Sequence, residues 1–363
     1  MISRENIYYW KSDRESAFEE IENVDYDKEQ MEILIQKVLE TFFGESEFTF
    51  RSAHGQGNHM TYLVEYKDTK YFLRLENGQE NDNYMEVEAT VLNKVGSVGV
   101  PTPKVYAVDV SRTKVPFTYQ IMEYIAYPDL NSLYKKKTLD LLPIAESIGR
   151  NIAKWQSLTF SGFGPFNNQI LRQEQKLVGI HSSYRDYFFL NLDTHLDFLV
   201  SHKFLIPGEA QEIKNVINEK VDLLALKKGC LVHKDMALWN ILGSHREIKS
   251  FIDWDDTISG DPMDDISLLA CFHSRDVIIE VLRGYSKVMG SLPENYLDRF
   301  WLHLLRNMIV KAVIRVGGNY FSKQDDFFLI DTGQSGTTLE EHTKKRMEIA
   351  IRGLRETVEI NKL

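Results

Sequence analysis

The sequence predicts an α+β protein with two lobes: a small N-terminal lobe built on an antiparallel sheet with one crossing helix, and a larger, mostly helical C-terminal lobe. Short apolar runs separated by turns fill the first third of the chain, a pattern typical of strands and hairpins. From Tyr184 onward, apolar residues recur at helical spacing instead. One stretch, 231–253, returns to short apolar runs between turns and predicts a strand-loop-strand core inside the helical lobe.

The composition is that of an ordinary globular protein: 363 residues, 43% hydrophobic and 26% charged, enough for a sizeable core and for one to three domains. The formal net charge of -10 disfavours nucleic acid and anionic membrane surfaces as partners and favours a cationic ligand, although many proteins are acidic for solubility alone.

No stretch approaches the roughly 20 apolar residues that cross a bilayer, and the polar N-terminus does not resemble a signal peptide. Cys230 and Cys271 lie in apolar runs, as buried thiols of a reducing compartment do. We therefore expect a cytoplasmic protein without membrane attachment, and the sequence does not indicate its oligomeric state.

The N-terminal lobe is expected over 27–124, after a polar segment, 1–26, that forms an arm or a short extra helix. A helix is predicted over 27–43, because apolar residues follow helical spacing up to Gly44. Alternating runs after it predict strands, and valines four residues apart predict a helix among them. The expected strands are 48–51, 61–66, 71–75, 105–110 and 117–123, and the expected helix is 84–95.

The C-terminal lobe is expected over 125–363. Apolar residues at helical spacing predict a helical insert at about 166–228 and further helices at about 264–363. Within the last group, 301–315 and 340–359 carry the longest helical patterns. We expect these C-terminal helices to form the outer wall of a substrate cleft.

The strongest chemical signal is the pattern His-x-Asp-x-x-x-x-Asn, formed by His233, Asp235 and Asn240, with Asp253 in a second apolar-flanked run downstream. Phosphoryl transfer needs a carboxylate that orients and deprotonates the attacking hydroxyl, which Asp235 fits. It also needs metal ions held by hard oxygen ligands, which the amide of Asn240 and the carboxylate of Asp253 supply. On the residues alone, a loop with a capping aspartate and a turn asparagine remains the alternative.

These residues resemble the catalytic loop of the aminoglycoside phosphotransferase superfamily, whose fold is protein-kinase-like. The resemblance implies that His233 and Asp235 are the catalytic residues of the loop and that Asp253 is the metal-binding aspartate. The run 260–266 is similar to the Gly-Asp-Pro-x-x-Asp-Leu element of the family, in which Asp265 would brace the loop.

The likeness extends from about 48 to 269, over more than half of the chain. Two aromatic segments, 161–166 and 184–188, resemble most closely the hygromycin phosphotransferase branch. They imply a turn that leads into a substrate-binding helical insert, while an ordinary loop with buried aromatic residues explains the individual positions equally well.

The resemblance also assigns nucleotide-binding residues to the N-terminal lobe. Arg74 occupies the strand position where the family usually has a phosphate-binding lysine, and arginine can grip phosphate through two nitrogens. Glu88 matches the helix glutamate that pairs with this cation. Without the motif downstream, a surface charge is an equally good interpretation of each residue.

Two further segments are candidates for nucleotide binding. Gly55, Gly57 and Asn58 lie between two predicted strands, where backbone N–H groups can fold over phosphates, although a plain hairpin turn fits as well. Glu123 and Tyr124 end a strand and match the hinge of the family, where backbone groups would hold a purine. Because the hinge binds the base through backbone groups, the sequence does not decide between the two purines, and we expect ATP or GTP as the donor.

Acidic residues gather in 251–265, which contains no Lys or Arg. Asp255, Asp256 and Asp264 are candidates for lining a cleft that takes a cationic substrate. A solvated acidic loop in which Asp264 caps a helix accounts for the same residues.

We therefore expect a small-molecule kinase that uses Mg²⁺ and transfers the γ-phosphate of ATP or GTP to a hydroxyl of an aminoglycoside-like antibiotic, an activity that confers antibiotic resistance. The alternatives are a metabolic kinase for choline, sugar or amino-alcohol substrates, and a catalytically inactive kinase-like binding protein. A protein kinase is disfavoured, because Ala237 stands where such kinases usually have Lys and no Ala-Pro-Glu element follows Asp253.

Overall fold

The computed structural model describes residues 3–14, 17–18, 28–53, 59–76, 82–322 and 338–363. The chain divides into two compact units, and each is described by itself. The sequence patterns predict boundaries after 26 and after 124; they do not predict that Arg4–Phe18 belongs to the second unit or that Ser250–Asp255 belongs to the first. The first unit comprises Met1–Ser3, Glu19–Ala126 and Ser250–Asp255, and the second comprises Arg4–Phe18, Tyr127–Lys249 and Asp256–Leu363.

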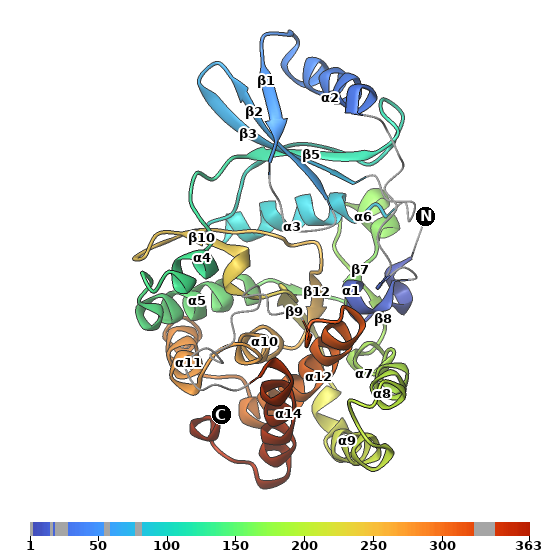
Figure 1. Cartoon of the computed structure of the whole chain (residues 1–363), viewed down its shortest axis with the longest axis vertical. Helices are drawn as coiled ribbons and strands as arrows, with labels where there is room; N and C mark the ends of the chain where they lie inside the picture. Colours follow the sequence, from blue (N-terminus) through green and yellow to red (C-terminus); the bar gives the residue numbers. More distant parts are fainter. Residues whose placement is uncertain (1–2, 15–16, 19–27, 54–58, 77–81, 323–337) are drawn as a thin grey trace. The chain divides into compact units, whose positions relative to one another are not determined.

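The first unit is built on a five-stranded antiparallel sheet with the order β1-β2-β3-β5-β4 (Figure 1). The hairpin between β2 and β3 turns at Lys67 and Asp68, both of which have a positive φ. The predicted antiparallel sheet is confirmed. Its strands are β1 (Thr49–Ser52), β2 (Met60–Tyr66), β3 (Thr69–Glu76), β4 (Val105–Asp109) and β5 (Thr118–Glu123).

Two helices complete the first unit, α2 (Lys28–Phe43) and α3 (Met85–Ser97). Helix α2 buries the face that carries Met31, Ile35 and Val38 against apolar side chains of the sheet. Gly44 ends it with φ +75°, a conformation that suits a residue without Cβ. Helix α3 packs against β4 and β5, and Glu88 lies on its buried side. Both helices lie where helical spacing predicts them.

The second unit holds a five-stranded sheet with the order β6-β9-β12-β7-β8, and strands β10 and β11 form a separate two-stranded sheet. These short strands provide the predicted strand-loop-strand core, because β9 and β10 flank the loop that carries His233, Asp235 and Asn240. The strands are β6 (Thr159–Phe160), β7 (Phe163–Phe166), β8 (Gly179–His181), β9 (Gly229–Val232), β10 (Ile241–Gly243), β11 (Ile248–Phe251) and β12 (Ile258–Gly260).

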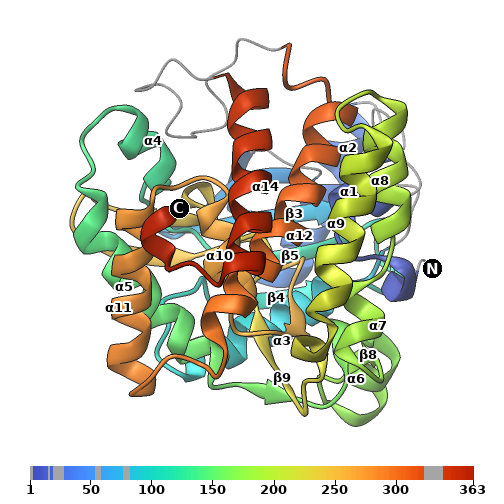
Figure 2. The same cartoon turned by 90° about the horizontal axis from the view of Figure 1, so that it is seen from below.

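Helices α5 (Leu141–Gln156) and α11 (Arg275–Met289) lie side by side in the second unit (Figure 2). Their backbones approach closely at two glycines. A Cβ on Gly149 would lie 1.9 Å from the carbonyl oxygen of Val281, and one on Gly284 would lie 1.9 Å from that of Glu146. Only glycine is compatible with this approach.

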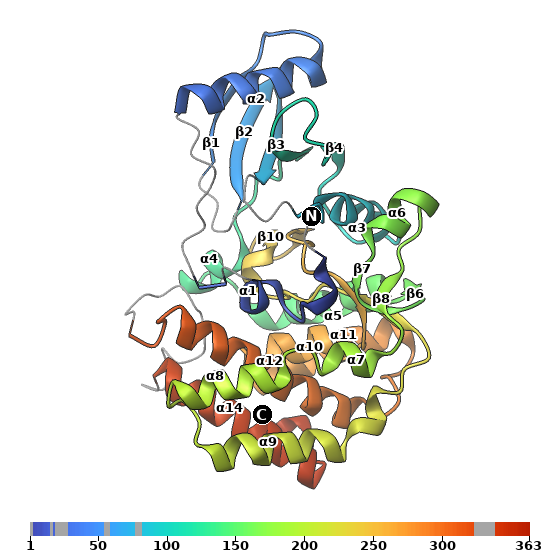
Figure 3. The same ribbon diagram turned by 90° about the vertical axis from the view of Figure 1, so that its right-hand side faces the viewer.

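Helix α12 (Tyr296–Gly317) is buried on all sides from Phe300 to Arg315. It packs against α1 (Trp10–Asp13), α8 (Leu192–Ser201), α10 (Asp264–Ala270) and α14 (Leu339–Glu356), and Figure 3 shows α1 and α8 beside it. A helix that is buried all round belongs to the centre of its unit. The expectation that it forms an outer wall is therefore wrong, although its existence and that of α14 are correctly predicted.

The remaining helices are short or belong to the insert after β6. Among the described helices, none is both long and apolar enough to cross a membrane. Both cysteines are buried thiols, as expected. The remaining helices of the described chain are α4 (Leu130–Lys135), α6 (Asn168–Glu174), α7 (Tyr184–Phe188) and α9 (Pro207–Glu219), with 3-10 turns at Arg4–Asn6, Val221–Leu224, Leu238–Asn240 and Ile360–Lys362.

Candidate active site

One buried carboxylate accepts hydrogen bonds from the backbone of the loop between β9 and the 3-10 turn Leu238–Asn240. Asp265, at the start of α10, accepts hydrogen bonds from the backbone N–H of His233 and of Lys234, each at 3.1 Å. The indole Nε1 of Trp155 on α5 donates to the same carboxylate at 3.0 Å. Lys234 has φ +69°, a strained conformation for a residue with a side chain. Asp265 thus holds the loop in a shape that its sequence does not favour by itself.

The side chain of Asp235 projects from this loop and is only 17% exposed. Its Oδ2 accepts from Nδ2 of Asn240 at 3.0 Å, and the same nitrogen donates to the backbone oxygen of Asp235 at 2.8 Å. Its Oδ1 accepts from the hydroxyl of Tyr9 at 2.8 Å and from Nζ of Lys311 at 3.3 Å. The loop therefore brings Asp235 and Asn240 together, and two residues distant in sequence complete the surroundings of the carboxylate.

Burial by itself raises the pKa of Asp235, but the positive charge of Lys311 and the hydrogen bond from Tyr9 outweigh it, so the pKa lies below the ordinary value for aspartate. Asp235 is therefore an anion at neutral pH. An ionised and partly exposed carboxylate can accept a proton from a hydroxyl group.

His233 is fully buried, and its Nδ1 accepts from the backbone N–H of Asp235 at 3.3 Å. The ring faces the interior of the unit, 6.4 Å from the ring of Trp155 between centroids. Its burial does not support the expectation of a catalytic role in contact with substrate. The position suits a residue that supports the loop.

The acidic run after β12 is neutralised inside the second unit. Asp264 is fully buried, and its carboxylate accepts from Nζ of Lys234 at 2.8 Å and from Nδ2 of Asn307 at 3.0 Å. Asp261 pairs with Arg299 at 2.5 Å. The carboxylate of Asp264 is occupied in the interior, so its burial does not support the expectation that it lines a substrate cleft. Asp256 is half-buried.

In the first unit, Arg74 on β3 forms a buried ion pair with Glu88 on α3. The other oxygen of Glu88 accepts from the backbone N–H of Trp254 at 3.1 Å. This bond ties the segment that contains Asp253 to α3. Nη1 of Arg74 then lies 3.8 Å from Oδ1 of Asp253, so these three predicted residues are neighbours.

Asp253 has φ +65° and a side chain that is 42% exposed. Asp255 behaves differently, because its Oδ2 lies 3.2 Å from Nε2 of His59 and its side chain is only 21% exposed. Of the two carboxylates in this segment, that of Asp253 is the more accessible.

The other predicted nucleotide-binding residues are only partly described. Gly55, Gly57 and Asn58 lie outside the described residues. Glu123 ends β5 and is exposed, and its Oε2 accepts from the backbone N–H of Lys104 at 3.2 Å. Tyr124 follows as a half-buried residue of the segment that leaves the sheet.

The donor set expected for magnesium consists of Asn240 in the second unit and Asp253 in the first. Nδ2 of Asn240 is engaged by Asp235, which leaves its amide oxygen as the atom that can bind a cation. Among the described residues, no three His, Cys, Asp or Glu side chains gather into a metal cluster. Two hard oxygen donors fit Mg²⁺, which is usually bound by one or two protein side chains with water and substrate phosphates.

A sequence profile of the family described as the phosphotransferase enzyme family, APH, matches residues 51–294. The chain belongs to this family. It is a phosphotransferase, and the resemblance stated from the catalytic-loop motif is confirmed at the level of the superfamily. A comparison with curated proteins found no match.

Solved structures show the fold of the phosphotransferase. Aminoglycoside phosphotransferase APH(4)-Ia superposes with a TM-score of 0.59 at 15% identity, over 88% of this chain and 98% of that chain. A thermostable mutant of the same protein, in a ternary complex with AMP-PNP and hygromycin B, gives 0.58 at 16% identity over 88% and 98%. Spectinomycin phosphotransferase APH(9)-Ia, in complex with ADP and spectinomycin, gives 0.53 at 12% identity over 89% and 98%. The predicted protein-kinase-like fold is confirmed.

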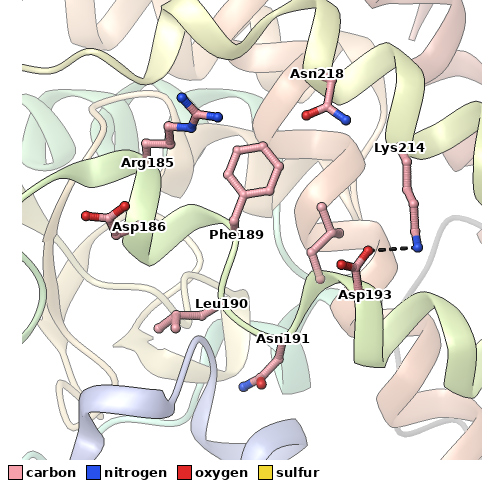
Figure 4. Close-up of a pocket in the computed structure, with 9 residues that line it drawn as sticks. Arg185, Asp186, Phe189, Leu190, Asn191, Asp193, Lys214 and Asn218 are labelled. Atoms are coloured by element: carbon pink, nitrogen blue, oxygen red, sulfur yellow. Dashed lines mark ion pairs between the residues drawn. The ribbon is translucent and has the colours of Figure 1, made fainter.

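The helical insert of the phosphotransferase carries a surface pocket of about 610 Å³ (Figure 4). It contains none of the residues predicted for catalysis or nucleotide binding. Lys214 and Asp193 form an ion pair at 2.8 Å on its wall. Its lining includes Arg185, Phe189, Asn191, Asp193, Lys214 and Asn218.

Asp13 anchors the N-terminal segment Arg4–Phe18 to the rest of the second unit of the phosphotransferase. Its Oδ1 lies 2.6 Å from Nε2 of His195, and Nη1 of Arg306 contacts Nδ1 of the same ring at 3.0 Å. Arginine only donates, so Nδ1 accepts and Nε2 carries the proton that is donated to Asp13. Burial lowers the pKa of His195, which keeps this ring neutral.

Asp13→Asn is expected to lower the free energy of unfolding by about 2 kcal/mol at pH 7. Burial raises the pKa of Asp13, but His195, Asn191 and Ser12 donate to it, and the pKa falls to about 2. The stabilisation is therefore complete above about pH 4 and disappears as the pH falls toward about 2. Urea unfolding of both proteins between pH 7 and pH 3 measures this, and a difference that does not shrink with acid contradicts it.

Proposed function

We propose that the phosphotransferase transfers the γ-phosphate of ATP or GTP to a hydroxyl of a small molecule, with an aminoglycoside-like compound as the acceptor. The observation that carries the proposal is the environment of Asp235. Its carboxylate is ionised, partly exposed and bonded to Asn240, on a loop that Asp265 holds in place. Such a carboxylate can orient the acceptor hydroxyl and take its proton as the phosphate is transferred.

Asn240 and Asp253 are the residues that would hold magnesium. When bound, magnesium neutralises charge on the nucleotide phosphates. The described donors suit this role, since one amide oxygen and one half-exposed carboxylate are hard ligands.

Arg74, oriented by Glu88, is the side chain of the first unit that would contact the nucleotide phosphates. The guanidinium is buried against Glu88, so its direction is fixed before a nucleotide arrives. An arginine oriented in this way can meet a phosphate through two nitrogens. Gly55, Gly57 and Asn58 would contribute backbone N–H groups, and Glu123 and Tyr124 would hold the base through their backbone.

The acceptor class rests on the related structures, in which APH(4)-Ia carries hygromycin B and APH(9)-Ia carries spectinomycin. Acidic residues alone do not support a cationic acceptor, because Asp264 is buried with Lys234 and Asp255 is engaged by His59. An acceptor that is an aminocyclitol antibiotic would make the chain an antibiotic-resistance enzyme.

The test is nucleoside diphosphate release by the purified protein with Mg²⁺ and ATP or GTP. The acceptor panel comprises aminoglycosides, hygromycin B, spectinomycin, choline and amino sugars, and Asp235→Ala is the inactive control. We expect one aminocyclitol to stimulate release in the native protein and not in the variant. Stimulation by choline or an amino sugar would instead establish the metabolic kinase. A protein that binds no magnesium-nucleotide would be a kinase-like binding protein.

A further inference from the structure

Two residues that touch Asp235 come from outside the part of the chain that matches the family. The match covers 51–294, whereas Tyr9 precedes it and Lys311 follows it. Tyr9 lies just before α1, and Lys311 lies on the buried helix α12. Both belong to the second unit, as does Asp235. The family profile therefore does not cover these two contacts of the carboxylate.

The segment that carries Tyr9 is fixed to the second unit on both sides of that residue. On one side, Tyr8 stacks on Tyr187 at 5.0 Å between centroids, and the guanidinium of Arg306 lies 3.7 Å from the Tyr8 ring centroid. On the other side, Asp13 accepts from Nδ2 of Asn191 at 2.9 Å, in addition to its contact with His195. Asn191, seen at the edge of the pocket in Figure 4, points toward this segment. Tyr9 is thus held in position between two anchors.

The direction of the hydrogen bond from Tyr9 follows from its neighbour. Nζ of Lys311 lies 3.3 Å from the hydroxyl oxygen of Tyr9, and an ammonium group can only donate. The hydroxyl therefore accepts from Lys311 and donates its own proton to Oδ1 of Asp235 at 2.8 Å. The ammonium also lies 4.8 Å from the centroid of the Tyr9 ring, which favours the same arrangement.

A carboxylate has about four acceptor positions, two on each oxygen. Tyr9 and Lys311 take both positions on Oδ1, and Asn240 takes one on Oδ2. Among the described residues, no fourth side chain donates to Asp235, so one position on Oδ2 remains. We propose that Tyr9 and Lys311 are positioning residues that saturate Oδ1 and fix the carboxylate plane, so that Oδ2 accepts the hydroxyl of the acceptor. This inference rests on the proposed role of Asp235 as the base.

The test removes each donor while keeping its bulk. Tyr9→Phe and Lys311→Met are each expected to lower kcat about 10-fold, because each takes one hydrogen bond from a charged group. The KM for nucleotide stays unchanged, since neither residue belongs to the proposed nucleotide site. Lys311→Arg keeps a donor and restores most of kcat. Tyr296→Phe is the matched control, because it removes the same hydroxyl from a half-buried residue at the start of α12 that belongs neither to the contacts of Asp235 nor to the anchors of Tyr9, and its kcat stays native.

A double-mutant cycle separates positioning from a general effect on the fold. If Tyr9 acts through Asp235, Tyr9→Phe has no further effect in an Asp235→Asn background, measured by single-turnover transfer of radiolabelled phosphate. An additional 10-fold loss in that background overturns the inference, as does a native or raised kcat in Tyr9→Phe alone. Failure of the proposed function looks different: Asp235→Asn itself would then keep near-native turnover.

Discussion

Asp235→Asn is expected to lower kcat by about 1,000-fold while magnesium-nucleotide binding persists. Asparagine has nearly the same shape, so Tyr9, Lys311 and the loop can keep their packing. It carries no charge and cannot take the proton of the acceptor hydroxyl. The loss should therefore appear in the chemical step, with little change in the KM for nucleotide.

The measurement combines steady-state phosphate transfer with calorimetric titration of magnesium-nucleotide. Asp197→Asn is the matched control, because it makes the same charge change at an exposed position of α8. That control should remain within about twofold of native kcat, since isolated surface charges contribute little. Residual kcat above about one tenth of native in Asp235→Asn would show that another group is the base.

The catalytic loop was the part of the site most open to prediction, because its chemistry lies in a short stretch of sequence. His233, Asp235 and Asn240 are brought together by a single loop, and the structure indeed places the side chain of Asn240 on the carboxylate of Asp235. The strands of the first unit were predictable for a similar reason. Their alternation and turn residues are local signals, and the observed bounds differ from the expected ones by a few residues at most.

Local patterns in the sequence could not show which polar residues are buried. Asp264 and Asp255 are typical of an exposed acidic loop in sequence, yet one is paired with Lys234 in the interior and the other with His59. His233 is part of the motif and is nevertheless fully buried. Whether a polar residue faces solvent depends on which distant elements cover it, and the pattern of neighbouring residues does not contain this information.

Tyr9 and Lys311 illustrate the limit most clearly. The hydrogen bond from Tyr9 to Asp235 spans 226 positions, and that from Lys311 spans 76. Helix α12 shows little separation of polar and apolar faces, because it is buried all round and uses its polar residues as internal partners. No periodic pattern marks Lys311 as a neighbour of the catalytic loop. The N-terminal segment is short and polar, and only its tertiary contacts show that it belongs with the second unit.

Asp253→Ala is expected to lower kcat by about 100-fold and to abolish the dependence of the remaining rate on magnesium concentration. The bond from Trp254 to Glu88 fixes the neighbouring residue of the segment, and the side chain of Asp253 itself is 42% exposed. It is therefore available as an oxygen ligand. The positive charge of Arg74 lies 3.8 Å away and attracts the same carboxylate.

Asp255→Ala is the matched control, since it removes the same group from the same segment. Its carboxylate is engaged by His59 and only 21% exposed, so the loss should disturb packing and leave the magnesium dependence of kcat native. Titrating magnesium at fixed nucleotide for both variants separates the two aspartates. Equal loss of magnesium dependence in both would place the metal between them, and loss in Asp255→Ala alone would transfer the ligand role to Asp255. Because both variants remove one negative charge near Arg74, a difference between them reports ligation and not the general field of the site.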